Sequence, residues 1–148
     1  MKQITLIMFF TLSLFTACAP SPDEPVGSDD PPAAPQTGDY IPSPADGALL
    51  RDQVFLEVTG LATLESYPVQ FLLQLKGSLP TPCHQLRIAV SPPDAESKVN
   101  VEVYSVTDPD KMCIQVLAPF EVGFPLGSFP PGTYSLWVNG EKAADFQS

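Results

Sequence analysis

The chain has a single histidine, a single tryptophan and only seven basic residues in a length of 148 residues. One histidine excludes a metal centre that is built from several imidazoles. Seventeen acidic residues outweigh the seven basic ones and give a formal net charge of -10. The basic footprint that nucleic-acid binders use is therefore missing. We expect neither a multi-histidine metal enzyme nor a nucleic-acid partner.

A mainly helical protein is also disfavoured, because the chain contains 18 prolines and proline breaks the interior of a helix. Eight of these prolines and six acidic residues, but no lysine or arginine, lie within residues 19–48. A segment of this composition buries too little apolar surface to offset its ordering entropy. We predict that residues 18–48 form a disordered linker rich in proline and aspartate. It acts as a spacer, or alternatively as a ligand for a proline-recognition module.

The first 17 residues have the pattern of an export signal. Lys2 supplies a positive start, and an apolar run extends from Ile4 to Phe15. The run is shorter than the roughly 20 residues of a membrane-spanning helix, and it ends in small residues before Cys18. The sequence predicts a signal peptide over residues 1–17. An ordinary secretory signal without lipid attachment is the alternative.

The segment Phe15-Thr16-Ala17-Cys18 resembles the lipobox of bacterial lipoproteins, with phenylalanine where that family prefers leucine. In that family the cysteine thiol carries a diacylglycerol, and the new amino group is acylated, for example with palmitate. The resemblance implies that Cys18 is the lipidated first residue of the mature chain. It also implies an extracytoplasmic protein of the cell envelope, held by its lipid on the outer membrane or the cell surface.

Residues 49–148 alternate between apolar and polar side chains with a period of two, which is typical of half-buried β-strands. Asn139-Gly140 predicts a two-residue type I′ hairpin turn. Seven to eight short strands indicate an all-β domain, an antiparallel sandwich or barrel. A short turn of helix is allowed at residues 60–66. The predicted strands cover residues 53–59, 67–76, 85–91, 98–107, 112–118, 120–126, 133–139 and 142–146.

Residues 127–140 resemble a pattern of Ig-like sandwiches in bacterial surface proteins, where a proline-glycine turn leads into a late strand. The resemblance implies an antiparallel Ig-like β-sandwich over residues 49–148. It also places Tyr134 at a corner of the sandwich, with its hydroxyl bonded to backbone. The domain is similar to a group of envelope lipoproteins in which residues 79–84 and 113–116 recur, a likeness that implies no activity.

Cys83 and Cys113 are the cysteines that remain once Cys18 is lipidated. Exported domains with two cysteines usually bridge them, so we predict a disulfide between the two. The alternative is a soft-metal (copper) or redox lipoprotein, in which His84 and Met112 join two reduced thiols. Neighbouring residues of a strand point to opposite faces, which disfavours convergence of Cys83 and His84.

Catalytic motifs are scarce: His84 is the only histidine, and no Gly-x-Ser-x-Gly sequence occurs. Asp108 and Asp110 flank a proline turn and lack the remaining ligands of a calcium loop. We expect no enzyme and no cofactor.

The leading hypothesis is a non-enzymatic binding or structural module for an unknown protein or glycan ligand. Tyr104, Phe129 and Trp137 are the candidate contacts, and ordinary packing is the alternative for their side chains. A further alternative is an inhibitor of an envelope hydrolase that inserts the rigid segment Leu79-Pro80-Thr81-Pro82.

Overall fold

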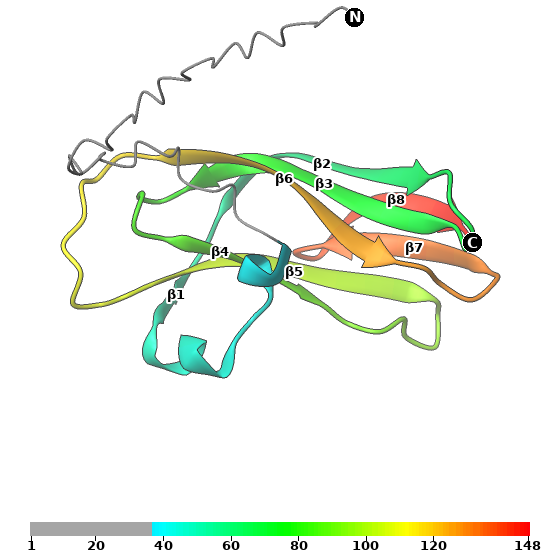
Figure 1. Ribbon diagram of the computed structural model, residues 1–148, viewed down its shortest axis with the longest axis horizontal. Coiled ribbons are helices and arrows are strands. Elements are labelled where there is room, and N and C mark those ends of the chain that lie inside the picture. Colours follow the sequence, from blue (N-terminus) through cyan, green and yellow to red (C-terminus); the bar gives the residue numbers. More distant parts are fainter. Residues whose placement is uncertain (1–36) are drawn as a thin grey trace, which may run out of the picture. The chain divides into compact units, whose positions relative to one another are not determined.

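The computed structural model describes residues 37–148, which form an all-β unit (Figure 1). Two short 3-10 helices precede the strands: η1 (Thr37–Tyr40) and η2 (Pro44–Ala48). The predicted all-β class is confirmed. The eight strands are β1 (Leu50–Asp52), β2 (Phe55–Leu64), β3 (Gln70–Leu79), β4 (Gln85–Val90), β5 (Lys98–Thr107), β6 (Ala118–Gly127), β7 (Thr133–Val138) and β8 (Glu141–Gln147).

The strands form two sheets that pack face to face. One sheet has the order β1-β5-β7-β8, with β4 on the other side of β5, and the second has the order β2-β3-β6. All pairs are antiparallel except β5–β7, which is parallel. On one side of β5, β7 pairs with residues 98–101 and β1 pairs with residues 105–107. A gap at residues 102–104 therefore separates the two partners of β5.

The core lies between the two sheets, because alternate residues of each strand point inward. Phe71, Leu73 and Leu75 of β3 are at most 1 % exposed. Val99 and Val101 of β5 face them from the other sheet and belong to the same cluster. This alternation is the one that the sequence predicts.

Aromatic side chains close the end of the core where β6 leads into β7. The rings of Phe71, Phe129, Tyr134 and Phe146 contact one another, with centroids 4.6–5.9 Å apart. The Tyr134 hydroxyl donates a 2.9 Å hydrogen bond to the carbonyl oxygen of Pro130. This is the backbone bond that the resemblance to sandwich corners implied.

The structure differs from the predicted strands at two places: one predicted strand is absent, and another is longer than predicted. Residues 112–118 were expected to form a strand, but residues 111–117 have no regular secondary structure. These residues pair with no strand, and the disulfide of Cys113 attaches them to the connection between β3 and β4. Residues 60–64, where a turn of helix was allowed, instead continue β2 and pair with β3.

The end of the predicted linker belongs to the folded unit. Residues 37–48 were expected to be disordered, but they form η1 and η2 beside β4. Ser43 and Asp46 form a capping box at the start of η2, the Ser-x-x-acid pattern that marks a helix N-terminus. Tyr40 packs against the core cluster. The folded unit thus begins before residue 49, and Cys18 and the signal peptide lie outside the described residues.

Candidate functional site

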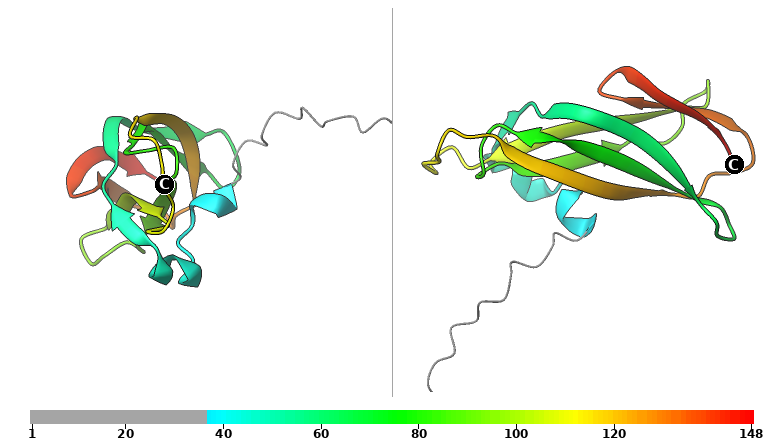
Figure 2. Two further views of the ribbon diagram at one scale, coloured as in Figure 1. Left: turned by 90° about the vertical axis from the view of Figure 1, so that its left-hand side faces the viewer. Right: turned by 90° about the horizontal axis from the view of Figure 1, so that it is seen from above.

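The most exposed apolar segment of the described chain is the tip loop, which we define as residues 108–117 between β5 and β6. It begins with a turn in which the Lys111 amide donates to the Asp108 carbonyl oxygen. Beyond this turn the chain runs past the ends of the strands, at the end of the sandwich opposite the C-terminus (Figure 1; Figure 2, right). Four apolar side chains of the loop are exposed: Met112 (93 %), Ile114 (70 %), Val116 (50 %) and Leu117 (56 %).

Two further exposed apolar residues lie at the same end. Leu50 is 58 % exposed and pairs with Thr107, where β5 enters the tip loop. Phe55 is 55 % exposed and pairs with Ser78, near the end of β3. Figure 2 (left) looks onto this end of the sandwich. Exposed apolar residues that gather at one end are a common mark of an interaction surface.

The disulfide between Cys83 and Cys113 fixes the middle of the tip loop, as the sequence predicted. It joins residues 30 positions apart with a Cα–Cα distance of 6.0 Å. Cys83 lies in the short connection between β3 and β4, so the bond ties the tip loop to both sheets. Because both sulfurs are bonded, neither is a thiolate ligand for a soft metal.

Next to Cys83 lies a polar cluster in which Thr81 and the His84 side chain are buried and the Asp52 side chain is exposed. The Thr81 hydroxyl lies 2.8 Å from Nδ1 of His84 and accepts a 3.3 Å hydrogen bond from the Cys83 amide. Nε2 of His84 is buried, has no hydrogen-bond partner, and lies 3.7 Å from a carboxylate oxygen of Asp52. The hydroxyl of Thr81, the imidazole of His84 and the carboxylate of Asp52 lie next to one another in space as in a hydrolytic triad. Thr81 is only 4 % exposed, however, so a substrate cannot reach its hydroxyl. We read the cluster as a structural base for the disulfide.

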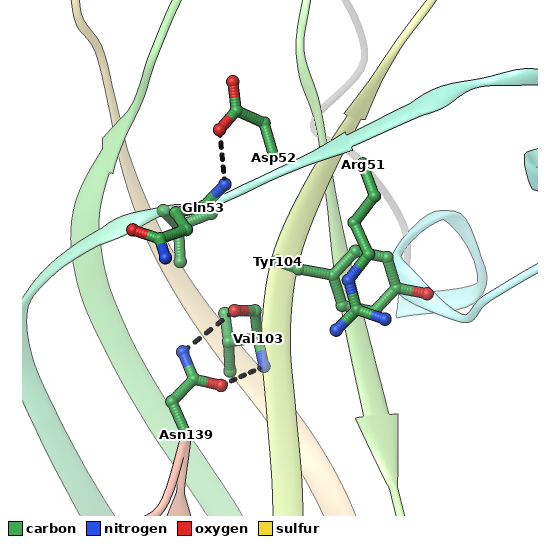
Figure 3. A pocket seen from close by; sticks show the side chains of 7 residues that line it. Arg51, Asp52, Gln53, Val103, Tyr104 and Asn139 are labelled. Carbon is green, nitrogen blue, oxygen red and sulfur yellow. Dashed lines mark hydrogen bonds between the residues drawn. The ribbon is translucent and has the colours of Figure 1, made fainter.

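A hollow of about 530 Å³ lies beside β5 where the first sheet has its gap. Figure 3 shows the Arg51 guanidinium over the Tyr104 ring, and its Cζ is 3.7 Å from the ring centroid. Arg51 also pairs with Glu102 at 3.2 Å. Tyr104, a predicted contact residue, is therefore half-buried under an arginine. The lining residues are Arg51, Asp52, Gln53, Val54, Val103, Tyr104 and Asn139.

Asn139 closes the gap with its side chain. Its carboxamide oxygen accepts a 2.8 Å hydrogen bond from the Val103 amide, and its Nδ2 donates to the Val103 carbonyl at 2.9 Å (Figure 3). Asn139 and Gly140 both have positive φ, 49° and 86°, as the predicted type I′ turn requires. The side chain thus takes the place of a missing strand residue, a role that the turn motif did not reveal.

Arg87 clamps the residues before β1 onto the outside of β4. Its Nε and Nη2 donate to the two carboxylate oxygens of Asp46 at 2.8 and 3.0 Å, and its Nη1 donates to the Asp39 carbonyl. The side chains of Arg87 and Asp46 are only 9 % and 12 % exposed. Hydrogen bonding from Arg87, with help from the Ser43 amide, lowers the pKa of Asp46.

The other predicted contact and ligand residues do not converge. Phe129 belongs to the aromatic cluster, so packing explains it. Trp137 covers the outer face of the first sheet, with Lys98 Nζ 4.1 Å from its ring centroid. The side chain of Met112 is exposed whereas that of His84 is buried, so the two do not form a joint metal site. Within residues 37–148, no group of three or more histidine, cysteine, aspartate or glutamate side chains is placed to hold a metal ion.

The segment proposed to insert into a hydrolase is also placed differently. Leu79 ends β3 and packs against the core, and Thr81 is buried. Leu79 and Thr81 are therefore not free to enter a cleft. The exposed apolar side chains lie on the other side of the disulfide, at Met112 and Ile114. None of the helices within residues 37–148 has the length and apolar content to cross a membrane.

Fold and disulfide together define a small disulfide-linked β-sandwich module with one projecting loop. The family model of the ORF11 beta-sandwich domain matches residues 73–148, just over half of the chain, and the chain belongs to that family. The match covers β4 to β8, most of β3, both bridged cysteines and the tip loop. No curated protein and no solved structure matches the chain.

Proposed function

We propose that this chain is a lipid-anchored lipoprotein of the cell envelope, and that its sandwich is a non-enzymatic module that binds or supports a partner outside the cytoplasm. The carrying observation is the distribution of the three cysteines. Two of them, Cys83 and Cys113, form the disulfide. The third, Cys18, directly follows the apolar segment that we predict to be an export signal. An unpaired thiol is a liability in an exported protein, whereas a lipidated cysteine is an anchor.

Two features of the sandwich support an extracytoplasmic binding role. A structural disulfide is typical of oxidising compartments. The exposed apolar side chains at the end that carries the tip loop offer a surface for a partner. The surroundings of His84 argue against a hydrolytic activity, because its imidazole contacts the hydroxyl of Thr81, which is buried. A serine- or threonine-dependent hydrolase needs an accessible nucleophile next to that imidazole.

Substitution of Cys18 tests the anchor. We expect the native chain to incorporate labelled palmitate and to sediment with membranes, and Cys18→Ala to lose both properties. The matched control is the double variant Cys83→Ala, Cys113→Ala, which changes the other cysteines and should stay in the membrane fraction. Retention of Cys18→Ala in the membrane fraction, or palmitate labelling without Cys18, would refute the lipid anchor.

A second measurement tests the location. Externally added maleimide should leave Cys83 and Cys113 unmodified in cells until a reductant is supplied, because both are bridged. Free thiols at both positions in intact cells would place the domain in a reducing compartment and contradict the proposal.

A further inference from the structure

We infer that the tip loop is a recognition loop that occupies the substrate cleft of an endopeptidase with apolar subsites, so that the protein inhibits that enzyme. The inference rests on the proposed function, in which the sandwich is a binding module, and it names the partner of that module. It replaces residues 79–82 by residues 108–117 as the inserted segment.

Exposed side chains of the right kind lie on both sides of the bridged cysteine. Met112 and Ile114 flank Cys113 and are 93 % and 70 % exposed, and Val116 follows at 50 %. A cleft that accepts a polypeptide chain takes such side chains into successive pockets. None of these three residues belongs to the core cluster, so nothing in the packing of the sandwich accounts for their apolar character.

The backbone of the loop has hydrogen-bonding capacity to offer. Within residues 112–117 the amides of Met112, Ile114 and Gln115 donate to no acceptor. The Val116 amide donates to the Ile114 carbonyl, and Nε2 of the Gln115 side chain donates to the Cys113 carbonyl. A peptide-binding cleft supplies backbone partners for such groups. A lipid bilayer supplies none, and an irregular loop in hydrocarbon carries a high desolvation cost. The loop therefore suits a protein partner.

The disulfide makes the loop a poor substrate and a good ligand. Cys113 is held by Cys83, and the chain enters β6 at Ala118, so both flanks of Ile114 are tied to the sandwich. Fixing a loop in advance lowers the entropy cost of binding. Hydrolysis of a bond between these anchors consumes one water and leaves a carboxylate and an ammonium group. Both ends stay attached to the domain, so they separate slowly.

Charge defines the rim of the partner's cleft. Residues 112–120 carry no charge. The arm that precedes them contains Asp108 and Asp110, followed directly by one base, Lys111. A cleft with an apolar floor and a basic rim on the side that meets this arm is electrostatically complementary. Residues 49–148 carry 11 acidic and 6 basic residues, and this excess of acid favours the same partner.

Inhibition of purified endopeptidases tests the inference. The chain, purified in mild detergent from whichever cell fraction contains it, is titrated into chymotrypsin, elastase and subtilisin, which cleave after apolar residues, with a small chromogenic peptide as substrate. We expect inhibition of at least one enzyme, and mass spectrometry should find the loop intact long after the reduced, unfolded chain has been cut. Ile114→Asp should weaken inhibition by about tenfold or more. The matched control Leu64→Asp changes an exposed apolar residue at the end of β2 and should inhibit like the native chain.

Three results would overturn the inference. In the first, the folded chain is cut within residues 112–117 as fast as the unfolded chain, without inhibition. In the second, no enzyme is inhibited. In the third, the unlipidated Cys18→Ala chain binds phosphatidylcholine vesicles and Ile114→Asp abolishes the binding, which makes the loop a lipid contact. These assays need no lipid on Cys18, and membrane fractionation needs no intact loop, so failure of this inference and failure of the lipid anchor are separate results.

Discussion

Arg87 on β4 binds Asp46 of η2 through both carboxylate oxygens, although the two residues are 41 positions apart in the sequence. The pair fixes the point at which the preceding segment joins the sandwich. Burial of Tyr40 adds to this attachment and raises the pKa of its phenol. Residues 37–48, the last part of the predicted spacer, are therefore attached to the sandwich. Only the residues before them are left as a spacer in our proposal.

Removal of the Arg87 guanidinium should detach residues 37–48 from β4. Arg87→Met keeps an unbranched side chain but loses every hydrogen bond to Asp46. We expect hydrogen exchange of the Asp46 and Leu49 amides to accelerate by about tenfold or more, because charged hydrogen bonds contribute about 1.5–3 kcal/mol. Arg51→Met is the control, since it removes an exposed pair with Glu102 and should leave that exchange unchanged. Equal exchange in Arg87→Met and the native chain would show that the clamp does not hold the segment.

Low pH should detach the same segment, residues 37–48, and the shift in the pKa of Asp46 tells in which pH range this happens. Hydrogen bonds from Arg87 and the Ser43 amide lower this pKa below its ordinary value of 3.8. The carboxylate therefore stabilises docking at all pH values above the ordinary pKa, and the stabilisation is lost as pH falls through the lowered one. We expect the amide signal of Leu49 in NMR spectra to stay constant from neutral pH to about pH 4 and to shift only below it. Asp46→Asn should remove this transition, and release well above pH 4 would contradict the assignment.

The local features of the fold were predictable because their causes are local. Alternation placed Phe71, Leu73 and Leu75 on the inner face of β3, and the turn chemistry of Asn139-Gly140 located the last hairpin. The disulfide followed from the cysteine count and the expected compartment. Each of these signals lies within a few residues or within the composition.

The features that the sequence concealed depend on contacts between distant segments. Nothing near Arg87 indicates that Asp46 covers it. Residues 112–118 read as a strand from their apolar content, but residues 111–117 pair with no strand, and Cys113 is instead bonded to Cys83. The Ser43-x-x-Asp46 capping pattern was a readable signal for η2, although the proline-rich composition around it favoured disorder.

Loss of the disulfide should destabilise the sandwich and free the tip loop. On the chain-entropy model, a bridge across 30 residues contributes about 3–4 kcal/mol to the free energy of unfolding. The double variant Cys83→Ala, Cys113→Ala should lose about that amount in urea titrations. Proteolysis within residues 112–117 should also become faster than in the native chain. A variant as stable as the native chain would mean that the buried cluster of Thr81 and His84 suffices to hold this end.

The carboxamide of Asn139 should contribute to stability beyond the turn that it forms. Asn139→Gly keeps the positive φ at no steric cost but leaves the amide and carbonyl of Val103 without their partner. At about 0.5–1.5 kcal/mol for each hydrogen bond, the expected loss in the free energy of unfolding is about 1–3 kcal/mol. Asn139→Asp keeps the acceptor for the Val103 amide and the tolerance of positive φ, but at neutral pH it places a carboxylate oxygen against the Val103 carbonyl oxygen, so it should also destabilise the fold. If both variants unfold at the same urea concentration as the native chain, water replaces the carboxamide in the gap, and the side chain has no structural role in joining the two halves of the first sheet.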